Sequence, residues 1–170
     1  MVYTDADGGM VLLTDVDRSI LMFESIVNFV KLTDTAQTPT HGSEQAAGWD
    51  LYADLGTKMI LIPPHETVMI PTGIAMALPE GTFGAIFARS GLATKKGLAP
   101  ANKVGVIDSD YRGEIMVALH NHGNTTQVVE GGERIAQLVV ISYCPITLNE
   151  ATALPTTERG SGGFGSTGMK

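Results

Sequence analysis

The chain has 170 residues, of which 44% are hydrophobic and 17% charged, a composition typical of one folded globular domain. Its formal net charge of −7 argues against a general nucleic-acid binder or a membrane-surface protein, because both need a basic field. The single cysteine, Cys144, excludes a disulfide framework within the chain.

The first 21 residues differ from the rest of the chain. They are acidic and weakly periodic, and Asp5 and Asp7 stand where a signal peptide would carry basic residues. No stretch approaches the roughly 20 uncharged apolar residues of a membrane helix. We therefore expect a soluble intracellular protein that binds neither membranes nor nucleic acid. In it, 1–21 form a dispensable extension, 22–155 a β domain and 156–170 a flexible glycine-rich tail.

From residue 23 onward, short apolar and β-branched runs recur between Gly, Pro, Asn and Asp. Strands are expected within 26–32, 49–54, 58–63, 66–79, 82–89, 97–108, 113–121 and 126–143. A single short helix is expected near Ser90–Lys96. Many short strands with almost no helix predict an all-β sandwich or barrel of the jelly-roll type.

Two of these segments place charged residues in or beside a strand. In "AAGWDLYA", residues 46–53, Asp50 lies mid-strand between apolar neighbours, where an acid is costly unless it is paired or functional. In "ARSGLATKKG", residues 88–97, a strand leads Arg89 and Ser90 into a helix N-terminus. Backbone N–H, hydroxyl and guanidinium groups there could bind an anion. The alternative is a Ser90 N-cap beside a surface arginine.

A third segment, "NKVGVIDSDYRGE" (102–114), is expected to form two short strands around a turn that contains Asp108, Asp110 and Tyr111. Such a hairpin exposes backbone N–H and C=O groups that can read a flat polar ring. It also brings two carboxylates together. One could act as a general base for water, and the other could be a turn residue only.

The last two segments are "GERIAQLVV" (132–140), where Gln137 interrupts an apolar strand, and the tail "ERGSGGFGSTGMK" (158–170). A phosphate loop is excluded for the tail, because no lysine precedes Ser166, no strand precedes the glycines and no helix can follow. A loose terminus and a lid that folds over an anionic ligand remain as alternatives.

Metal-binding side chains are sparse. His120 and His122 alternate at strand spacing in "ALHNHG", so both are expected on one face. With no third ligand nearby, solvent-facing or strand-pairing roles are favoured over a metal site.

In their order and spacing, the five segments resemble the five motifs of the trimeric deoxyuridine triphosphate nucleotidohydrolases, the dUTPases, over roughly residues 23–168. The most specific matches are "GVIDSDYRGE" and "RGSGGFGSTG"; Trp49 departs from the smaller residue that is more common in the family. The resemblance implies a jelly-roll β subunit in a homotrimer, with three active sites at subunit interfaces. It implies hydrolysis of dUTP to dUMP and pyrophosphate with Mg²⁺, which keeps uracil out of DNA and supplies dUMP for dTMP synthesis, in a bacterial cytoplasm or a phage-infected cell.

The resemblance also implies roles for individual residues. Asp108 is similar to the acid that deprotonates the water attacking the α-phosphate, and Tyr111 to the tyrosine that packs under deoxyribose. Asp50 resembles an acid near the metal and the tail arginine, while Mg²⁺ itself is held by substrate phosphates and water. The rest of the implied substrate-binding set is Arg89, Ser90, Gly91, Asn102, Gly105, Val106, Ile107, Met116, Gln137, Arg159, Gly162, Gly163, Phe164, Gly165, Ser166 and Thr167.

By the same resemblance, the tail closes over bound nucleotide. Arg159, Ser166 and Thr167 would reach the terminal phosphates, and Phe164 would stack on the uracil.

Two other functions are considered on this fold. A dCTP deaminase, or a bifunctional deaminase–diphosphatase, needs a glutamate base, and none is identified in a suitable place. A non-catalytic dUTP-sensing protein would be expected to lack Asp108 or the tail, and both are present.

Overall fold

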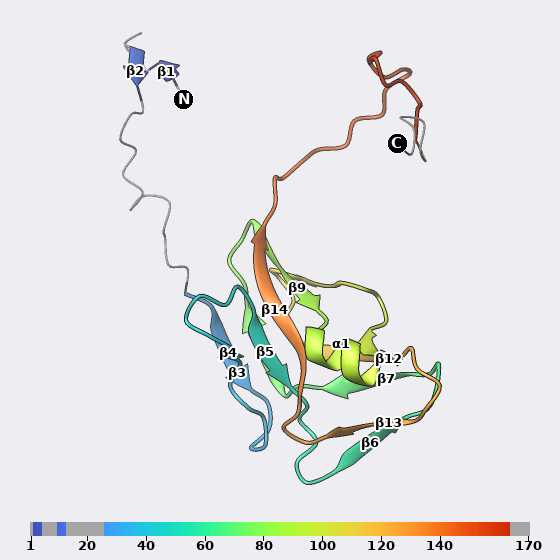
Figure 1. The fold of residues 1–170 in the computed structure, drawn as a ribbon. Coiled ribbons are helices and arrows are strands. Elements are labelled where there is room, and N and C mark those ends of the chain that lie inside the picture. The colour runs from blue at the N-terminus through green and yellow to red at the C-terminus, as the bar shows by residue number, and fades with distance from the viewer. Residues whose placement is uncertain (1, 5–9, 13–25, 164–170) are drawn as a thin grey trace.

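The computed structural model describes residues 2–4, 10–12 and 26–163 (Figure 1). In chain order the elements are β1 (Val2–Thr4), β2 (Met10–Leu12), β3 (Asn28–Lys31), β4 (Thr40–His41), β5 (Trp49–Tyr52), β6 (Met59–Ile62), β7 (Thr67–Pro71), β8 (Ile74–Ala77), β9 (Thr82–Phe87), α1 (Ser90–Lys96), β10 (Leu98–Pro100), β11 (Gly105–Asp108), β12 (Met116–Asn121), β13 (Gln127–Glu130) and β14 (Arg134–Ser142). The expected mostly-β fold is confirmed. Within the described ranges α1 is the one helix, at the residues predicted for it.

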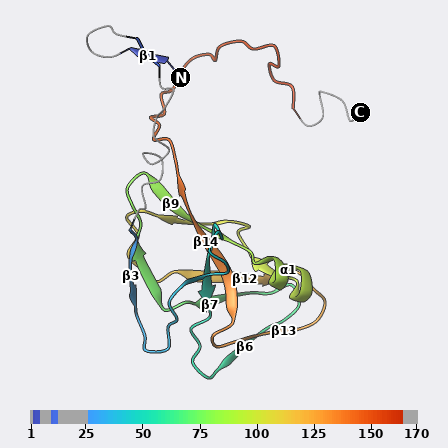
Figure 2. The same cartoon turned by 60° about the vertical axis from the view of Figure 1, so that its left-hand side comes forward.

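The strands form several antiparallel sheets (Figures 1 and 2). A five-stranded sheet has the order β11-β9-β14-β5-β4, and a three-stranded sheet the order β10-β12-β7. Three further pairs are β1-β2, β3-β8 and β6-β13. The long strand β14 lies between β5 and β9, so segments that are far apart in the sequence meet along it.

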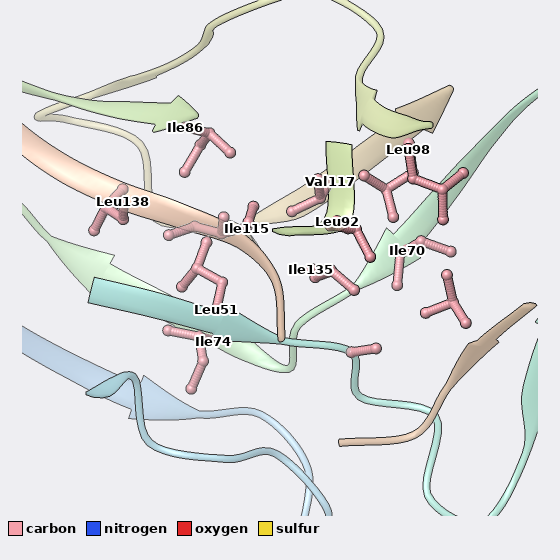
Figure 3. Packing of buried hydrophobic residues seen from close by; sticks show 14 of the residues in the cluster. Leu51, Ile70, Ile74, Ile86, Leu92, Leu98, Ile115, Val117, Ile135 and Leu138 are labelled. Carbon is pink, nitrogen blue, oxygen red and sulfur yellow. The ribbon is translucent and has the colours of Figure 1, made fainter. Parts of the chain in front are cut away.

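The core is a cluster of apolar side chains from both larger sheets and from α1 (Figure 3). Leu51, Ile86 and Leu138 come from the five-stranded sheet, and Ile70 and Val117 come from the three-stranded sheet. All are almost completely removed from water, which is the main stabilising contribution to such a fold.

The residues on either side of α1 explain where the helix begins and ends. Arg89, in an extended conformation, is the N-cap, and its side chain makes no capping hydrogen bond. Gly97 ends the helix with φ of 64°, a left-handed conformation that glycine adopts without steric cost. Lys95 and Lys96 lie in the last turn, where their positive charges interact favourably with the negative end of the helix dipole. The alternative of a Ser90 N-cap is therefore wrong, because Ser90 is the first helical residue.

The predicted hairpin over 102–114 is also wrong. β11 pairs with β9, with Gly105 opposite Ile86 and Asp108 opposite Phe83. The chain then turns and runs to β12, which joins the other sheet. β9 needs a partner on the edge away from β14, and β11 supplies it, so a distant pairing replaces the local one.

Three short strands were not predicted. β4 has two residues inside a turn-rich connection, and β1 and β2 lie in the segment expected to be a plain extension. Runs of two or three residues are too short to show a period of two.

After β14 the chain leaves the β domain as an extended segment (Figures 1 and 2). Residues 143–161 are exposed and contain neither helix nor strand. They include Ile146, Leu148 and Leu154, which are 77%, 90% and 86% exposed. Among the described residues, no helix has the length and apolar composition needed to span a bilayer.

Candidate active site

The five-stranded sheet brings three of the sequence segments together. In β14, Gln137 lies opposite Asp50 of β5 on one side and Phe87 of β9 on the other. Directly opposite residues in antiparallel strands project to the same face. Arg89 follows Phe87 by two residues, so it reaches the same side of the sheet. This is why residues from positions 50, 89 and 137 become neighbours.

Asp50 forms the centre of this cluster. Its side chain is buried, with the residue only 6% exposed. Arg89 Nε donates to Asp50 Oδ1 at 2.7 Å, and Arg134 Nη1 donates to Asp50 Oδ2 at 3.2 Å. A buried carboxylate is costly unless it is paired, and here each oxygen accepts a charged hydrogen bond. The carboxylate in turn fixes two guanidinium groups at one end of the sheet.

Arg134 was not among the predicted site residues. It precedes Gln137 by three residues, so regular alternation would place the two side chains on opposite faces. The pairing of β14 with β5 shifts register between Arg134 and Ala136. Such a bulge re-aims a side chain, and this one lets Arg134 reach Asp50. Its only sequence signal is a charge just before an apolar strand.

Gln137 is held next to the loop that presents Arg89. Its Nε2 donates to the Ala88 carbonyl at 2.9 Å. Its Oε1 would lie 3.0 Å from a Cβ placed on Gly48, so the glycine leaves room for the amide. Ser90 and Gly91 follow at the exposed start of α1. Arg89, Ser90, Gly91 and Gln137 therefore gather around the same strand end.

A second group lies along β11. A pocket of about 280 Å³ is lined by Met69, Val106, Ile107, Asp108, Tyr111, Glu114 and Met116. β11 is the edge strand of its sheet, so one side of its backbone faces outward and can bond to a ligand. Asp108, at the end of this strand, is exposed. Asn102 lies close by, with Nδ2 3.4 Å from where a Gly105 Cβ would be.

The turn after β11 is fixed by its own hydrogen bonds. Tyr111 N donates to the Asp108 carbonyl at 3.1 Å, and Arg112 Nη1 donates to the Ser109 carbonyl at 2.7 Å. A larger hollow of about 890 Å³ also reaches Val106 and Asp108 and is bordered by Phe83, Asp110 and Tyr143, among others. Asp108 thus borders both hollows.

Comparison with known proteins shows the family of the chain. The dUTPase family model matches residues 34–168. The chain belongs to the dUTPase family. It is 49% identical to the deoxyuridine 5'-triphosphate nucleotidohydrolase of Desulfitobacterium hafniense, over 84% of this chain and 95% of that protein. It is 46% identical to the same-named protein of Hydrogenobaculum, over 82% and 96%. Among solved structures, a mutant dUTPase of Staphylococcus bacteriophage 80alpha with dUpNHpp shares 25% identity and a TM-score of 0.76, covering 84% and 98%.

Within this chain, the five sequence segments form three separate groups. The strand-end cluster around Asp50 is one, and the pocket along β11 is another; that pocket contains neither Arg89 nor Gln137. The third is the tail, which extends away from the β domain (Figure 1). There Arg159 Nε donates to the Gly162 carbonyl at 3.0 Å, and Gly162 and Gly163 are half-buried. Phe164, Gly165, Ser166 and Thr167 lie outside the described residues.

His120 and His122 lie side by side at the end of β12. His120 and His122 share a face as expected, with ring centroids 4.5 Å apart. Desolvation, followed by the charges of His120, Lys103 and His65, lowers the pKa of His122 below its ordinary value. Among the described residues, no three His, Cys, Asp or Glu side chains are placed to hold a metal ion together.

Proposed function

We propose that this member of the dUTPase family hydrolyses dUTP to dUMP and pyrophosphate. The observation that carries the proposal is 49% identity to a curated deoxyuridine 5'-triphosphate nucleotidohydrolase over 84% of the chain. The reaction keeps uracil out of DNA and supplies dUMP for dTMP synthesis. The geometry of Asp108 and of the Asp50 cluster supports a mechanism in which each side chain has a distinct task.

Asp108 is the proposed catalytic base. It stands exposed at the end of β11 and borders the nucleoside-sized pocket, where water can reach its carboxylate. It accepts a proton from the water that attacks the α-phosphorus. The bond from that phosphorus to the bridging oxygen then breaks, so that dUMP and pyrophosphate leave. A positioned base of this kind contributes about 10²–10⁴-fold to a rate.

Arg89, Ser90 and Gln137 are the proposed phosphate ligands. Charge grows on phosphate oxygens during attack, and donors fixed in advance stabilise it without reorganising. Asp50 holds Arg89 in such a fixed position through the 2.7 Å bond to Nε, which leaves the terminal nitrogens of the guanidinium to face the substrate. Arg134, on the other oxygen of Asp50, adds positive charge to the same strand end.

The pocket along β11 is the proposed nucleoside site. Its volume of about 280 Å³ suits a base and a sugar. The outward backbone groups of Gly105, Val106 and Ile107 would pair with the polar edge of uracil, as an edge strand pairs with another strand. Asn102 would assist at one end, and Met116 would provide an apolar wall. Tyr111 would pack against C2′ of the deoxyribose.

Mg²⁺ is the proposed cofactor, and the donor set fits an ion that arrives with the substrate. The described residues offer no group of three protein ligands, and both oxygens of Asp50 already accept bonds from arginine. Mg²⁺ commonly keeps several waters and binds substrate phosphates instead of a protein cage. When bound, it would neutralise charge on the phosphate oxygens.

A homotrimer of jelly-roll subunits, with active sites at the subunit interfaces, is part of the proposal. Two observations support it. The strand-end cluster and the β11 pocket are separate within one chain. Ile146, Leu148 and Leu154 stand exposed on the segment after β14. Burial of these side chains against another chain would remove their apolar surface from water. We further propose that 22–155 form the catalytic domain and that 156–170 act as a lid over bound dUTP.

Substrate comparison tests the function. Purified protein with Mg²⁺ should release pyrophosphate from dUTP far faster than from UTP, dTTP or dCTP. Amine release from dCTP, measured in the same samples, should be absent. Deamination of dCTP without pyrophosphate release from dUTP would overturn the proposal.

A further inference from the structure

The ring of Tyr111 lies directly over Gly113. A Cβ placed on Gly113 would lie 2.4 Å from Tyr111 Oη, 2.6 Å from Cζ and 3.0 Å from Cε2. These are the three nearest atoms, and all belong to this ring. Two of the distances are shorter than non-bonded carbon and oxygen atoms tolerate. Any side chain at 113 would therefore displace the ring.

The backbone does not explain the glycine. Glycines with positive φ in the described residues are Gly56, Gly73, Gly81, Gly97, Gly132 and Gly160, and Gly113 is not among them. Its φ is therefore one that other residues adopt readily. The requirement at this position is space for the neighbouring ring.

Hydrogen bonds fix the backbone segment against which the Tyr111 ring lies. Tyr111 Oη donates to the Glu114 carbonyl at 3.0 Å. The carboxylate of Glu114 accepts the Gly73 N–H at 2.8 Å, and the Thr72 hydroxyl donates to the Ile115 carbonyl at 2.6 Å. Thr72 is almost fully buried, so these bonds tie the segment to the β7–β8 turn at the core. These bonds therefore fix the position of the Tyr111 ring in the wall of the β11 pocket.

We propose that Gly113 is a specificity-determining positioning residue for sugar selection. Because Gly113 has no side chain, the Tyr111 ring can lie against the backbone of 113–114. In this position the ring leaves room for C2′ of deoxyribose but not for a 2′-hydroxyl. The inference rests on the proposed dUTP hydrolysis and on the proposed sugar contact of Tyr111. It adds that the selectivity depends on a residue outside the pocket lining.

The test compares kcat/KM for dUTP and UTP in Gly113→Ala and wild type. The ratio should fall by about tenfold or more, since one misplaced methyl-sized contact changes discrimination by about that factor. Gly42→Ala is the matched control, because a Cβ on Gly42 meets nothing within 4 Å and its φ is not positive. Its ratio should equal that of wild type.

A second background shows whether Gly113 acts through the ring. In Tyr111→Ala protein, adding Gly113→Ala should change the ratio by less than about twofold, because the obstructed ring is gone. An unchanged ratio in the single variant would overturn the inference, as would an equal fall in both backgrounds. If Gly113→Ala does not fold, the double variant must fold, and its failure would also count against the proposal. Wild type that does not hydrolyse dUTP would instead reject the proposed function.

Discussion

Replacing Asp50 by asparagine would test how the strand-end cluster works. The carboxylate accepts charged hydrogen bonds from Arg89 at 2.7 Å and from Arg134 at 3.2 Å. Asn keeps the shape and can accept from one arginine, but its amide N–H₂ then faces the other. Hydrogen bonds to charged groups contribute about 1.5–3 kcal/mol when buried. The arginine side chains are 27% and 47% exposed, so water replaces part of the loss.

We therefore expect Asp50→Asn to lower the free energy of unfolding by about 1–2 kcal/mol, which is a fall in Tm of about 2–8 °C for a chain of this size. The effect on turnover should be larger than on stability. A shift of Arg89 by about 1 Å would lower kcat about 100-fold, because pre-set phosphate donors would be misplaced. The assays are thermal unfolding and pyrophosphate release over a range of dUTP concentrations.

Asp54→Asn is a matched control, because Asp54 accepts bonds only from the hydroxyls of Thr33 and Thr35 among the interactions found for its carboxylate. It should lose stability but keep kcat. The positioning role of Asp50 would be refuted if Asp50→Asn folded normally and kept kcat within about threefold of wild type, or if Asp54→Asn lost as much activity.

Three further predictions concern the ends of the chain. A protein starting at Met22 should assemble and hydrolyse dUTP like the full chain, since the family match begins at residue 34; an insoluble or inactive product would show that 1–21 are needed. Deleting 159–170 should leave Tm nearly unchanged, because 159–161 are exposed, while lowering dUTP turnover by orders of magnitude. Phe164→Ala should reduce turnover more mildly. Unfolding of the truncated protein, or hydrolysis at the full rate, would contradict the lid.

Much of the fold follows from local sequence. The helix over Ser90–Lys96 was predictable because a strand ends before it and Gly97 stops it. In β7, Ile70 is buried and Met69 is exposed, which is the alternation of a strand with one face on the core. These features depend only on near neighbours along the chain.

What could not be predicted depends on distant pairing. The partner of β11 is β9, and nothing in the residues around Asp108 distinguishes that from a local hairpin. Arg134 joins Asp50 only because of a register shift in β14. The motifs supplied the candidate site residues. Their separation into a strand-end cluster, a pocket and a tail became visible only in three dimensions.

The most direct test of the central claim is single-turnover pyrophosphate release by Asp108→Asn, measured beside its binding of a non-hydrolysable dUTP analogue. Asparagine keeps the shape of the side chain but does not take the proton from water at neutral pH. The proposed mechanism predicts wild-type binding of the analogue with release slowed by about 10²–10⁴-fold. Release within about tenfold of the wild-type rate, with binding intact, would contradict Asp108 as the base.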